Sequence, residues 1–294
     1  MKPKEDTHYK QKQAWRGLAA ALLSMMVPGM GQLRNGRIAK AILFYSLSMP
    51  LAVVLLLTGA ADTFTGFVAI AVWLLGWTTW AVFDALMEAY YGRTGPAAWY
   101  TRAYFLIPLL CVVFIITFAV RHVVKTRLYN SYYIPSASME PTLQTGDYII
   151  ADLRCYHIHT PASGDIVIFR HPNHPVEYHI KRCIGVAGQE VAIRDKVVYV
   201  DGNLFSDSIK VQFTRPMILP ETYQSPYIYP EGAGNWDNYG PVLVPEDHIF
   251  VLGDNRDDSM DSRIWGFVPL KSVRARPLYI YWSADKRRIS MPVE

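Results

Sequence analysis

Hydrophobic and polar positions divide the chain into two unlike halves. Four runs without a charged residue lie before residue 121, at 17–33, 41–61, 63–83 and 103–120. A hydrocarbon core about 30 Å thick is crossed by about 20 apolar helical residues. We therefore expect membrane spans at about 41–61, 63–83 and 103–120, and we interpret residues 1–120 as an α-helical membrane region.

The first uncharged run differs from the other three, because Pro28 and Gly29 interrupt it. Proline and glycine break helices, so we interpret residues 17–36 as an interfacial or re-entrant segment. A secretory signal peptide is the alternative, since basic residues precede the run. No small-x-small cleavage site follows, however, and more basic residues come next. The pattern assigns no role to residues 1–40.

Beyond residue 120 the chain changes to short β-branched runs separated by Gly, Pro, Asn and Asp. A period of two with such turn residues is typical of strands. Strands are predicted in the stretches 147–153, 165–170, 191–194, 197–200 and 248–252. Asp201 and Gly202 follow the fourth stretch and indicate a hairpin turn. Residues 121–294 are therefore expected to form an all-β domain.

Two parts of this domain are less regular. Prolines, tyrosines and glycines crowd residues 203–240, which we interpret as an irregular insertion. The residues after Trp282 are polar, and we expect them to be peripheral. Between the predicted strands, we also expect a strand at His157 and His159, which are separated by one residue.

Charge predicts the orientation in the membrane. Residues 1–120 hold 10 Lys and Arg against 5 Asp and Glu, whereas the remainder holds 19 against 20. Eight of those ten basic residues precede Ala41. Basic residues collect on the cytoplasmic side, so we expect a multi-pass protein with a cytoplasmic N-terminus and residues 121–294 outside. A full span through 17–33 would reverse this orientation. The basic residues at 121–127 also argue against this orientation, because they would lie at the outer end of the last span.

Cysteines and histidines decide little. Cys155 and Cys183 could form a disulfide in an oxidising compartment, but the sequence does not show whether they are close enough. A zinc site formed by the histidines at 157, 159, 171 and 174 lacks the usual ligand spacing. We expect no metal and no cofactor.

The first candidate for chemistry is Ser138, in the stretch Ile134–Leu143, IPSASMEPTL. Serine in a proline-rich loop is more often a turn former than a nucleophile, and a nucleophilic serine needs a base. No histidine stands in a recognisable triad context. Lys181 lies on an apolar strand-like run, where desolvation would favour its neutral, basic form. The alternative is a surface lysine next to Arg182.

The second candidate is the stretch Gly253–Arg263, GDNRDDSMDSR, which holds four acidic and two basic residues. A calcium loop is one alternative, but its central glycine and terminal glutamate are missing. An Asp/Arg network that rigidifies a loop fits the composition better.

Four stretches in this order resemble the bacterial type I signal peptidase (leader peptidase) family of membrane-bound Ser/Lys proteases. They are PSASMEPTL, GDIVIF (Gly164–Phe169), KRCIGVAGQ (Lys181–Gln189) and GDNRDDSMDSRIWGFVP (Gly253–Pro269). The resemblance covers about Ser131 to Pro277. It implies a signal-peptidase-type fold of two mostly antiparallel β-sheets behind the membrane region. It also implies the bacterial plasma (inner) membrane, with the catalytic domain on the periplasmic or extracellular side.

The resemblance implies a role for each matching residue. Ser138 is the expected nucleophile and Lys181 its general base. The Ser136 hydroxyl and the Ser138 N–H are expected to bind the oxyanion. The supporting residues are expected to be Ser259, which orients the lysine amine, and Asp261, which pairs with Arg263. The strand that enters the serine stretch is expected to edge the substrate groove, which suggests Ile134, Pro135, Ala137 and Met139 as substrate-binding residues.

The implied activity is removal of N-terminal signal peptides after small-x-small sites. The expected partners are signal-peptide-bearing preproteins and the lipid bilayer, without nucleic acid or an obligate protein partner. Two alternatives stay open: a specialised member that matures one or a few secretion, conjugation or pilus proteins, and a non-catalytic β domain that binds polypeptides. His179 stands where the family often has tyrosine, and its role is open.

Overall fold

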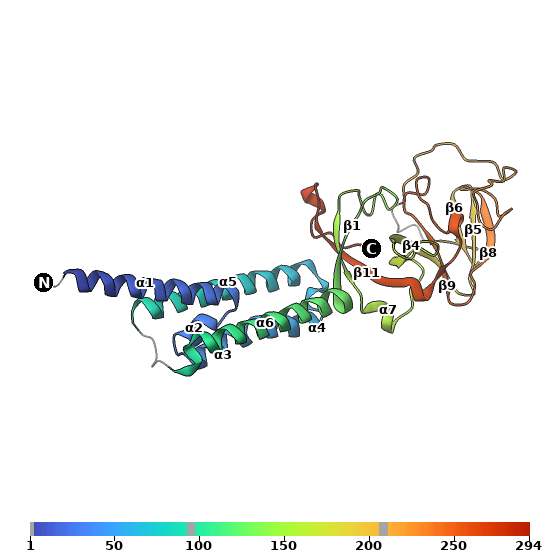
Figure 1. The fold of residues 1–294 in the computed structure, drawn as a ribbon. Coiled ribbons are helices and arrows are strands. Elements are labelled where there is room, and N and C mark those ends of the chain that lie inside the picture. Colours follow the sequence, from blue (N-terminus) through green and yellow to red (C-terminus); the bar gives the residue numbers. More distant parts are fainter. Residues whose placement is uncertain (1–2, 93–97, 206–210) are drawn as a thin grey trace. The chain divides into compact units, whose positions relative to one another are not determined.

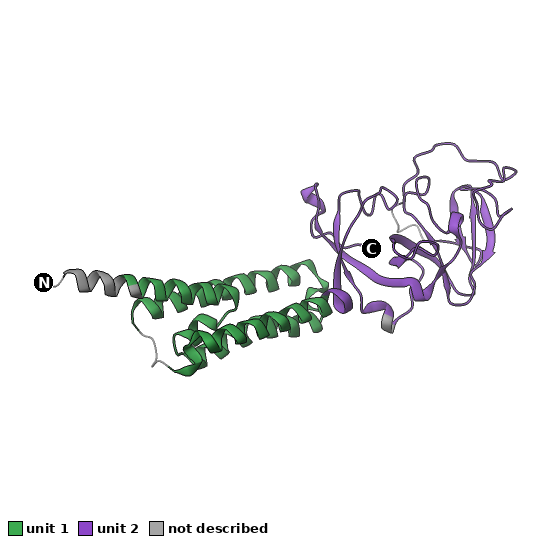
Figure 2. Cartoon of the chain, viewed as in Figure 1, with its two compact units in different colours: residues 1–124 green, residues 125–294 purple. Residues whose placement is uncertain are grey.

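The structure is a computed structural model that describes residues 3–92, 98–205 and 211–294 (Figure 1). The chain forms two compact units, residues 1–124 and 125–294 (Figure 2). The first unit is helical and the second consists mainly of β-strands. This division agrees with the change of hydrophobic pattern near residue 120.

The helices of the first unit follow the uncharged runs. They are α1 (Pro3–Met26), α2 (Met30–Arg34), α3 (Ile38–Ser46), α4 (Met49–Leu57), α5 (Phe64–Tyr90) and α6 (Ala103–Val123). Two 3-10 turns (Ala60–Asp62 and Trp99–Thr101) lie between helices, and a π-helical turn (Val124–Leu128) follows α6. Among the residues that the structure describes, three segments are long and apolar enough to cross a membrane, namely Ile38–Leu57, Phe64–Tyr90 and Ala103–Leu128.

The predicted interruption near Pro28 separates α1 from α2. Gly29 adopts a φ of 100°, and a Cβ atom at this position would collide with the backbone oxygen of Ala41. Only glycine meets both conditions. The turn is held to α5 by Gln32, whose amide donates to the Ala81 carbonyl at 2.7 Å and accepts from Ser24 Oγ at 3.0 Å.

The run 41–61 forms two helices instead of one, because α3 and α4 are separated at Leu47 and Ser48. Pro50 cannot donate a backbone hydrogen bond, so the helix cannot continue unbroken through this point. Indole groups of α5 satisfy carbonyls beside the break. Trp77 Nε1 donates to the Phe44 carbonyl at 2.9 Å, and Trp73 Nε1 donates to the Leu47 carbonyl at 3.0 Å.

The second unit contains two antiparallel sheets. The larger has the order β1-β2-β11-β3-β4-β9-β10 and the smaller β7-β6-β5-β8. The strands are β1 (Tyr129–Tyr133), β2 (Tyr148–Asp152), β3 (Ile166–Arg170), β4 (Tyr178–Val186), β5 (Glu190–Arg194), β6 (Val197–Val200), β7 (Asn203–Leu204), β8 (Tyr239–Leu243), β9 (His248–Leu252), β10 (Val268–Pro269) and β11 (Val273–Trp282). Short helices α7 (Cys155–Ile158) and α8 (Ser262–Trp265) and 3-10 turns Leu270–Ser272 and Lys286–Arg288 complete the unit. The predicted fold class is confirmed.

The β unit is built around apolar faces of these sheets. One cluster includes Ile134, Met139 and Leu143, which anchor the segment that follows β1. A second joins the smaller sheet to the larger one through Ile184 and Phe250. Burial of these residues fixes the loops from which the polar site side chains extend.

Three details differ from the predictions. β11 was not predicted, because Pro277 and alternating arginines obscure its pattern, yet it is a central strand of the larger sheet. His157 lies in the helix α7 and not on a strand. The residues after Trp282 are not merely peripheral, because Val293 joins the core and Arg288 is buried.

Candidate active site

Ser138 lies in the segment between β1 and β2, residues 134–147, which we call the serine loop. Backbone hydrogen bonds close its base: the Ile134 N–H donates to the Asp147 carbonyl, and the Gly146 N–H donates to the Ile134 carbonyl, both at 2.9 Å. Inside the loop the Leu143 N–H donates to the Met139 carbonyl. The Ser138 side chain is therefore carried by a short, internally bonded segment.

Lys181 approaches this loop from β4. Its backbone pairs with Val167 of β3, and its Nζ lies 2.6 Å from Ser138 Oγ. Only 4% of the residue is exposed. Two residues separated by 43 positions are thus brought together by the fold, in the contact that a serine nucleophile and its base require.

Burial changes the acidity of Lys181. Desolvation lowers the pKa of its ammonium group from 10.5 to about 8, with a further lowering by Arg263, whereas the charges of Asp261 and Asp254 act in the opposite direction. Desolvation outweighs the two carboxylates because it penalises the charged form directly. A neutral amine is therefore accessible close to physiological pH.

The two other predicted serines lie close to Ser138 in different ways. Ser136 is exposed, and its Oγ is 3.3 Å from Ser138 Oγ. Ser259 is buried, and its Oγ makes no hydrogen bond of standard geometry to the residues that the structure describes. It lies near enough to Asp261 to help lower the pKa of that carboxyl. The structure thus places Ser259 beside the site without a bond to the lysine amine.

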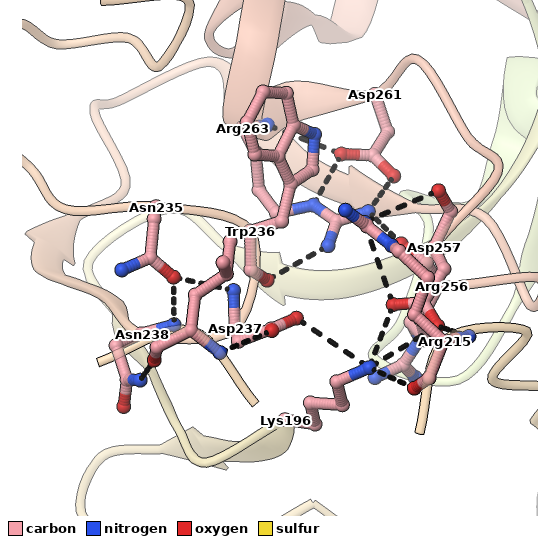
Figure 3. A network of polar contacts seen from close by, with 11 residues as sticks. Lys196, Arg215, Asn235, Trp236, Asp237, Asn238, Arg256, Asp257, Asp261 and Arg263 are labelled. Atoms are coloured by element: carbon pink, nitrogen blue, oxygen red, sulfur yellow. Dashed lines mark hydrogen bonds and ion pairs between the residues drawn. The ribbon is translucent and has the colours of Figure 1, made fainter. Parts of the chain in front are cut away.

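Asp261 and Arg263 form a fully buried pair (Figure 3). Arg263 donates Nε to Asp261 Oδ1 at 2.9 Å and Nη2 to Oδ2 at 2.8 Å. Burial raises the pKa of the Asp261 carboxyl, but the charge and hydrogen bonds of Arg263 outweigh this, so the pKa lies below its ordinary value. The remaining guanidinium donors reach the carbonyls of Trp236 and Arg256.

The same network connects the smaller sheet to this region (Figure 3). Lys196, in the turn between β5 and β6, donates to Asp257 at 3.0 Å and lies 3.8 Å from Asp237. Asp257 also accepts from the Arg215 backbone N–H. Most acidic side chains of the 253–263 stretch thus pair with Lys or Arg, which supports the Asp/Arg network over a calcium loop.

Two residues of this stretch contact the serine loop directly, although the sequence did not single them out. Asn255 donates its backbone N–H to the Ser138 carbonyl and its side-chain amide to the Ala137 carbonyl, both at 3.2 Å. At Gly253 a Cβ atom would collide with the Ser138 carbonyl and with the Ser259 side chain. The absence of a side chain at Gly253 therefore permits the close approach of the 253–263 stretch to the serine loop. The only sequence signal for Asn255 and Gly253 was that both lie in this polar stretch.

Asp254 forms hydrogen bonds to residues that lie near Lys181 and Ser138 in the sequence. It accepts two hydrogen bonds from Arg182, at 2.8 and 2.7 Å, and one from Thr142 Oγ1 at 2.6 Å. Arg182 directly follows Lys181, and Thr142 lies four residues after Ser138. Arg182 is 2% exposed, so the surface Lys-Arg alternative does not hold.

A groove of about 480 Å³ opens beside Ser138 and Lys181. Residues of β1 and the serine loop line one side, and the start of β4 lines the other, including Tyr178 and His179. Three of the expected substrate-binding residues, Ile134, Pro135 and Met139, line the groove. Ala137 is not among the lining residues.

His179 belongs to an aromatic cluster with His171, His174 and Trp265. The His179 ring lies 4.8 Å from the His171 ring and 5.4 Å from the Trp265 ring. Burial, followed by the charge of Lys181, lowers the pKa of His179. Across 3–92, 98–205 and 211–294, no three His, Cys, Asp or Glu side chains are arranged to hold a metal ion. The side chain of His157 lies outside the described residues, and Cys155 and Cys183 are free thiols.

Comparisons with known proteins identify the family of this chain. A family model described as signal peptidase, peptidase S26, matches residues 106–282, more than half of the chain. A probable signal peptidase I-2 from Synechocystis sp. is 36% identical over 169 residues, which cover 55% of this chain and 67% of the relative. A probable signal peptidase I-1 from the same organism is 32% identical over 188 residues, covering 61% and 83%.

A crystal structure of a signal peptidase I from Enterococcus faecalis is 29% identical and covers 40% of this chain and 97% of its own, with a TM-score of 0.30. Because that score is low, the assignment rests on the family match and the sequence relatives. This chain belongs to the S26 family of signal peptidases.

Proposed function

We propose that this signal peptidase cleaves preproteins with Ser138 as its nucleophile and Lys181 as its general base. The contact of 2.6 Å between Lys181 Nζ and Ser138 Oγ is the observation that carries the proposal. Neutral Lys181 removes the serine proton while Oγ attacks the carbonyl at the cleavage site. The resulting ammonium protonates the leaving amine, and water then hydrolyses the acyl-enzyme.

The developing oxyanion is assigned to the Ser136 hydroxyl and the Ser138 backbone N–H. The distance of 3.3 Å between the two serine Oγ atoms supports this role for Ser136. Ser259 is assigned to orient the lysine amine, because its hydroxyl is buried beside the site and available to a nearby donor or acceptor. Asp261 and Arg263 are assigned to hold the surrounding backbone.

The substrate is proposed to bind as an extended strand in the groove. β1 is an edge strand of its sheet. β4 pairs with β9 only from Arg182 onwards, among the pairings described, which leaves the groove-facing start of β4 without that neighbour. Main-chain hydrogen bonds to such edges give affinity independent of sequence. Ile134, Pro135 and Met139, which line the groove, are assigned to recognition of the small residues before the cleavage site.

The proposed orientation places the N-terminus in the cytoplasm and residues 121–294 on the outer side of the membrane. The excess of basic residues before Ala41 supports it, and three segments of sufficient length and apolarity are present. Protease accessibility of residues 203–239 in intact spheroplasts tests this orientation. Cleavage there without permeabilisation is expected, and protection that is lost on permeabilisation would contradict it.

A specialised substrate range is the second candidate. Residues 1–105 lie outside the part that the family model matches, and they include α1 to α5. This additional helical region is compatible with a specialised substrate range. Depletion of the protein followed by a survey of unprocessed exported proteins separates the two candidates. Accumulation of many precursors supports general processing, and accumulation of one or a few supports specialisation.

Replacement of the two catalytic candidates tests the mechanism. Ser138→Ala and Lys181→Met should each abolish preprotein cleavage by the purified full-length protein while thermal unfolding remains cooperative. Ser290→Ala, an exposed serine of the C-terminal segment, is the matched control and should cleave normally. Retained cleavage in either catalytic variant would refute the assignment.

A further inference from the structure

The C-terminal segment, residues 283–294, follows β11 and contributes one buried arginine to the serine loop. Arg288 lies in a 3-10 turn and is 9% exposed. Its guanidinium donates Nη2 to Asp147 Oδ2 at 2.7 Å and Nε to the same oxygen at 3.2 Å. Nη2 also donates to the Thr142 carbonyl at 2.8 Å. One side chain therefore bonds to two points of the loop.

Asp147 is itself part of the loop base. Its backbone carbonyl accepts from Ile134, and its carboxylate accepts from the Gln144 N–H at 2.9 Å. Burial raises the pKa of this carboxyl, but the hydrogen bonds from Arg288 and Gln144 outweigh it, so the pKa lies below its ordinary value. The carboxylate is thus ionised at neutral pH and fully engaged in holding the turn that ends the loop.

The side chain of Thr142 forms a second contact that holds the serine loop. Its hydroxyl donates to Asp254, which also binds Arg182. Arg182 is the neighbour of Lys181 on β4. The Thr142 carbonyl is bonded to Arg288 and its hydroxyl to Asp254, so a continuous polar path joins the C-terminal segment, the serine loop and the lysine strand.

We propose that Arg288 is a positioning residue that holds Ser138 within bonding distance of Lys181. It acts through Asp147 and Thr142 and touches neither the substrate nor the reacting atoms. The proposal rests on the proposed role of Ser138 as nucleophile. The family match ends at residue 282, so Arg288 lies outside the matched part of the chain.

Loss of the hydrogen bonds from Arg288 to Asp147 and Thr142 should affect the kinetics in a defined way. A displacement of about 1 Å in a catalytic group can lower the rate about 100-fold. The charges that act on Lys181 belong to Asp261, Asp254 and Arg263, and none of these is removed with Arg288. We therefore expect a lower kcat, a nearly unchanged KM and an acid limb of the pH profile that stays in place.

The test compares Arg288→Ala with Arg287→Ala in the full-length protein, using a preprotein substrate. Arg287 is the adjacent arginine, but its side chain is 88% exposed and pairs with Asp285, so its removal deletes the same charge without affecting the loop. We expect Arg287→Ala to match the wild type. Arg288→Ala should lose about 10- to 100-fold in kcat, and added ethylguanidinium should restore part of it by refilling the buried site.

Equal kcat values for the two alanine variants would overturn the proposal. A loss in Arg288→Ala that appears equally in KM, or that ethylguanidinium does not relieve, would do the same. If Arg288→Ala does not fold, Arg288→Lys takes its place. We expect this variant to lose about 3- to 10-fold in kcat, because one ammonium group cannot reproduce the contacts with both Asp147 and Thr142. Full activity in Arg288→Lys would then overturn the proposal. Ser138→Ala, assayed in parallel, separates this proposal from the catalytic assignment. If that variant still cleaves, the assignment itself fails.

Discussion

Lys181 Nζ lies 2.6 Å from Ser138 Oγ, although the two residues come from a strand and a loop that are 43 positions apart. The lysine is almost fully buried, and its pKa is lowered to about 8. The contact and the lowered pKa together support the proposed role of Ser138 as a nucleophile with a lysine base. Four measurable consequences follow from the residues around this contact.

The pH dependence of cleavage should follow Lys181. Only the neutral amine accepts the serine proton, so kcat/KM should rise with pH through a midpoint of about 8. Initial rates on a peptide substrate between pH 5 and pH 10, within the stable range of the protein, measure this limb. A midpoint near the ordinary lysine value of about 10.4 would show that the amine is not desolvated.

The free energy of unfolding should respond to the same group, and it should rise with pH as the activity does. The folded-state pKa is below the unfolded value, so the ammonium destabilises the folded protein below about pH 8, and the penalty disappears as pH rises towards 10.5. Its size is on the order of 3 kcal/mol. Lys181→Met removes the charge, and its thermal unfolding midpoint at pH 7 should equal or exceed that of the wild type. A large decrease would contradict the burial argument.

Asp261→Asn should move the acid limb of the activity profile to lower pH. The charge of Asp261 stabilises the lysine ammonium and so raises the pKa of Lys181. Without this carboxylate only Asp254 still raises that pKa, against the lowering by desolvation and by Arg263. Removal of one partner of a buried pair also costs about 3–5 kcal/mol of folding free energy. The profile is therefore measured at a temperature where the variant is folded, and an alkaline shift would be inconsistent with this account.

Gly253→Ala tests the close approach of the polar stretch to the serine loop. The added methyl group would overlap the Ser138 carbonyl and the Ser259 side chain, so the loop must move. A loss of about 100-fold in kcat is expected. Gly76→Ala is the control, because a Cβ atom at that position meets no neighbouring atom within 4 Å. Equal activities in the two variants would argue against tight packing at Gly253.

The sequence predicted the parts of this protein that depend on local pattern. Apolar runs indicated the helices, β-branched alternation indicated five strands, and the Pro28-Gly29 pair indicated the turn after α1. β11 was not predicted, because arginines and Pro277 interrupt its alternation of apolar and polar residues. In the fold it lies between β2 and β3, where part of it is buried. Strand pairing across the sheet, rather than local propensity, determines that element.

The site shows the same division. Ser138 and Lys181 were identified because they stand in stretches that resemble a known family. Thr142 and Arg288 were not, because their importance arises from long-range pairing with Asp254 and Asp147. A polar residue in a tail with no periodicity carries no local signal of burial. Only the folded chain reveals that Arg288 contacts the serine loop.

The central claim is that Ser138 forms the covalent intermediate, and the most direct measurement is its detection. A preprotein is mixed with the full-length protein, the reaction is quenched in acid during turnover, and the enzyme is digested for mass spectrometry. We predict a signal-peptide ester on the fragment that contains Ser138, and its absence in Ser138→Ala. Cleavage by Ser138→Ala, or an ester on a different residue of the wild type, would contradict the account.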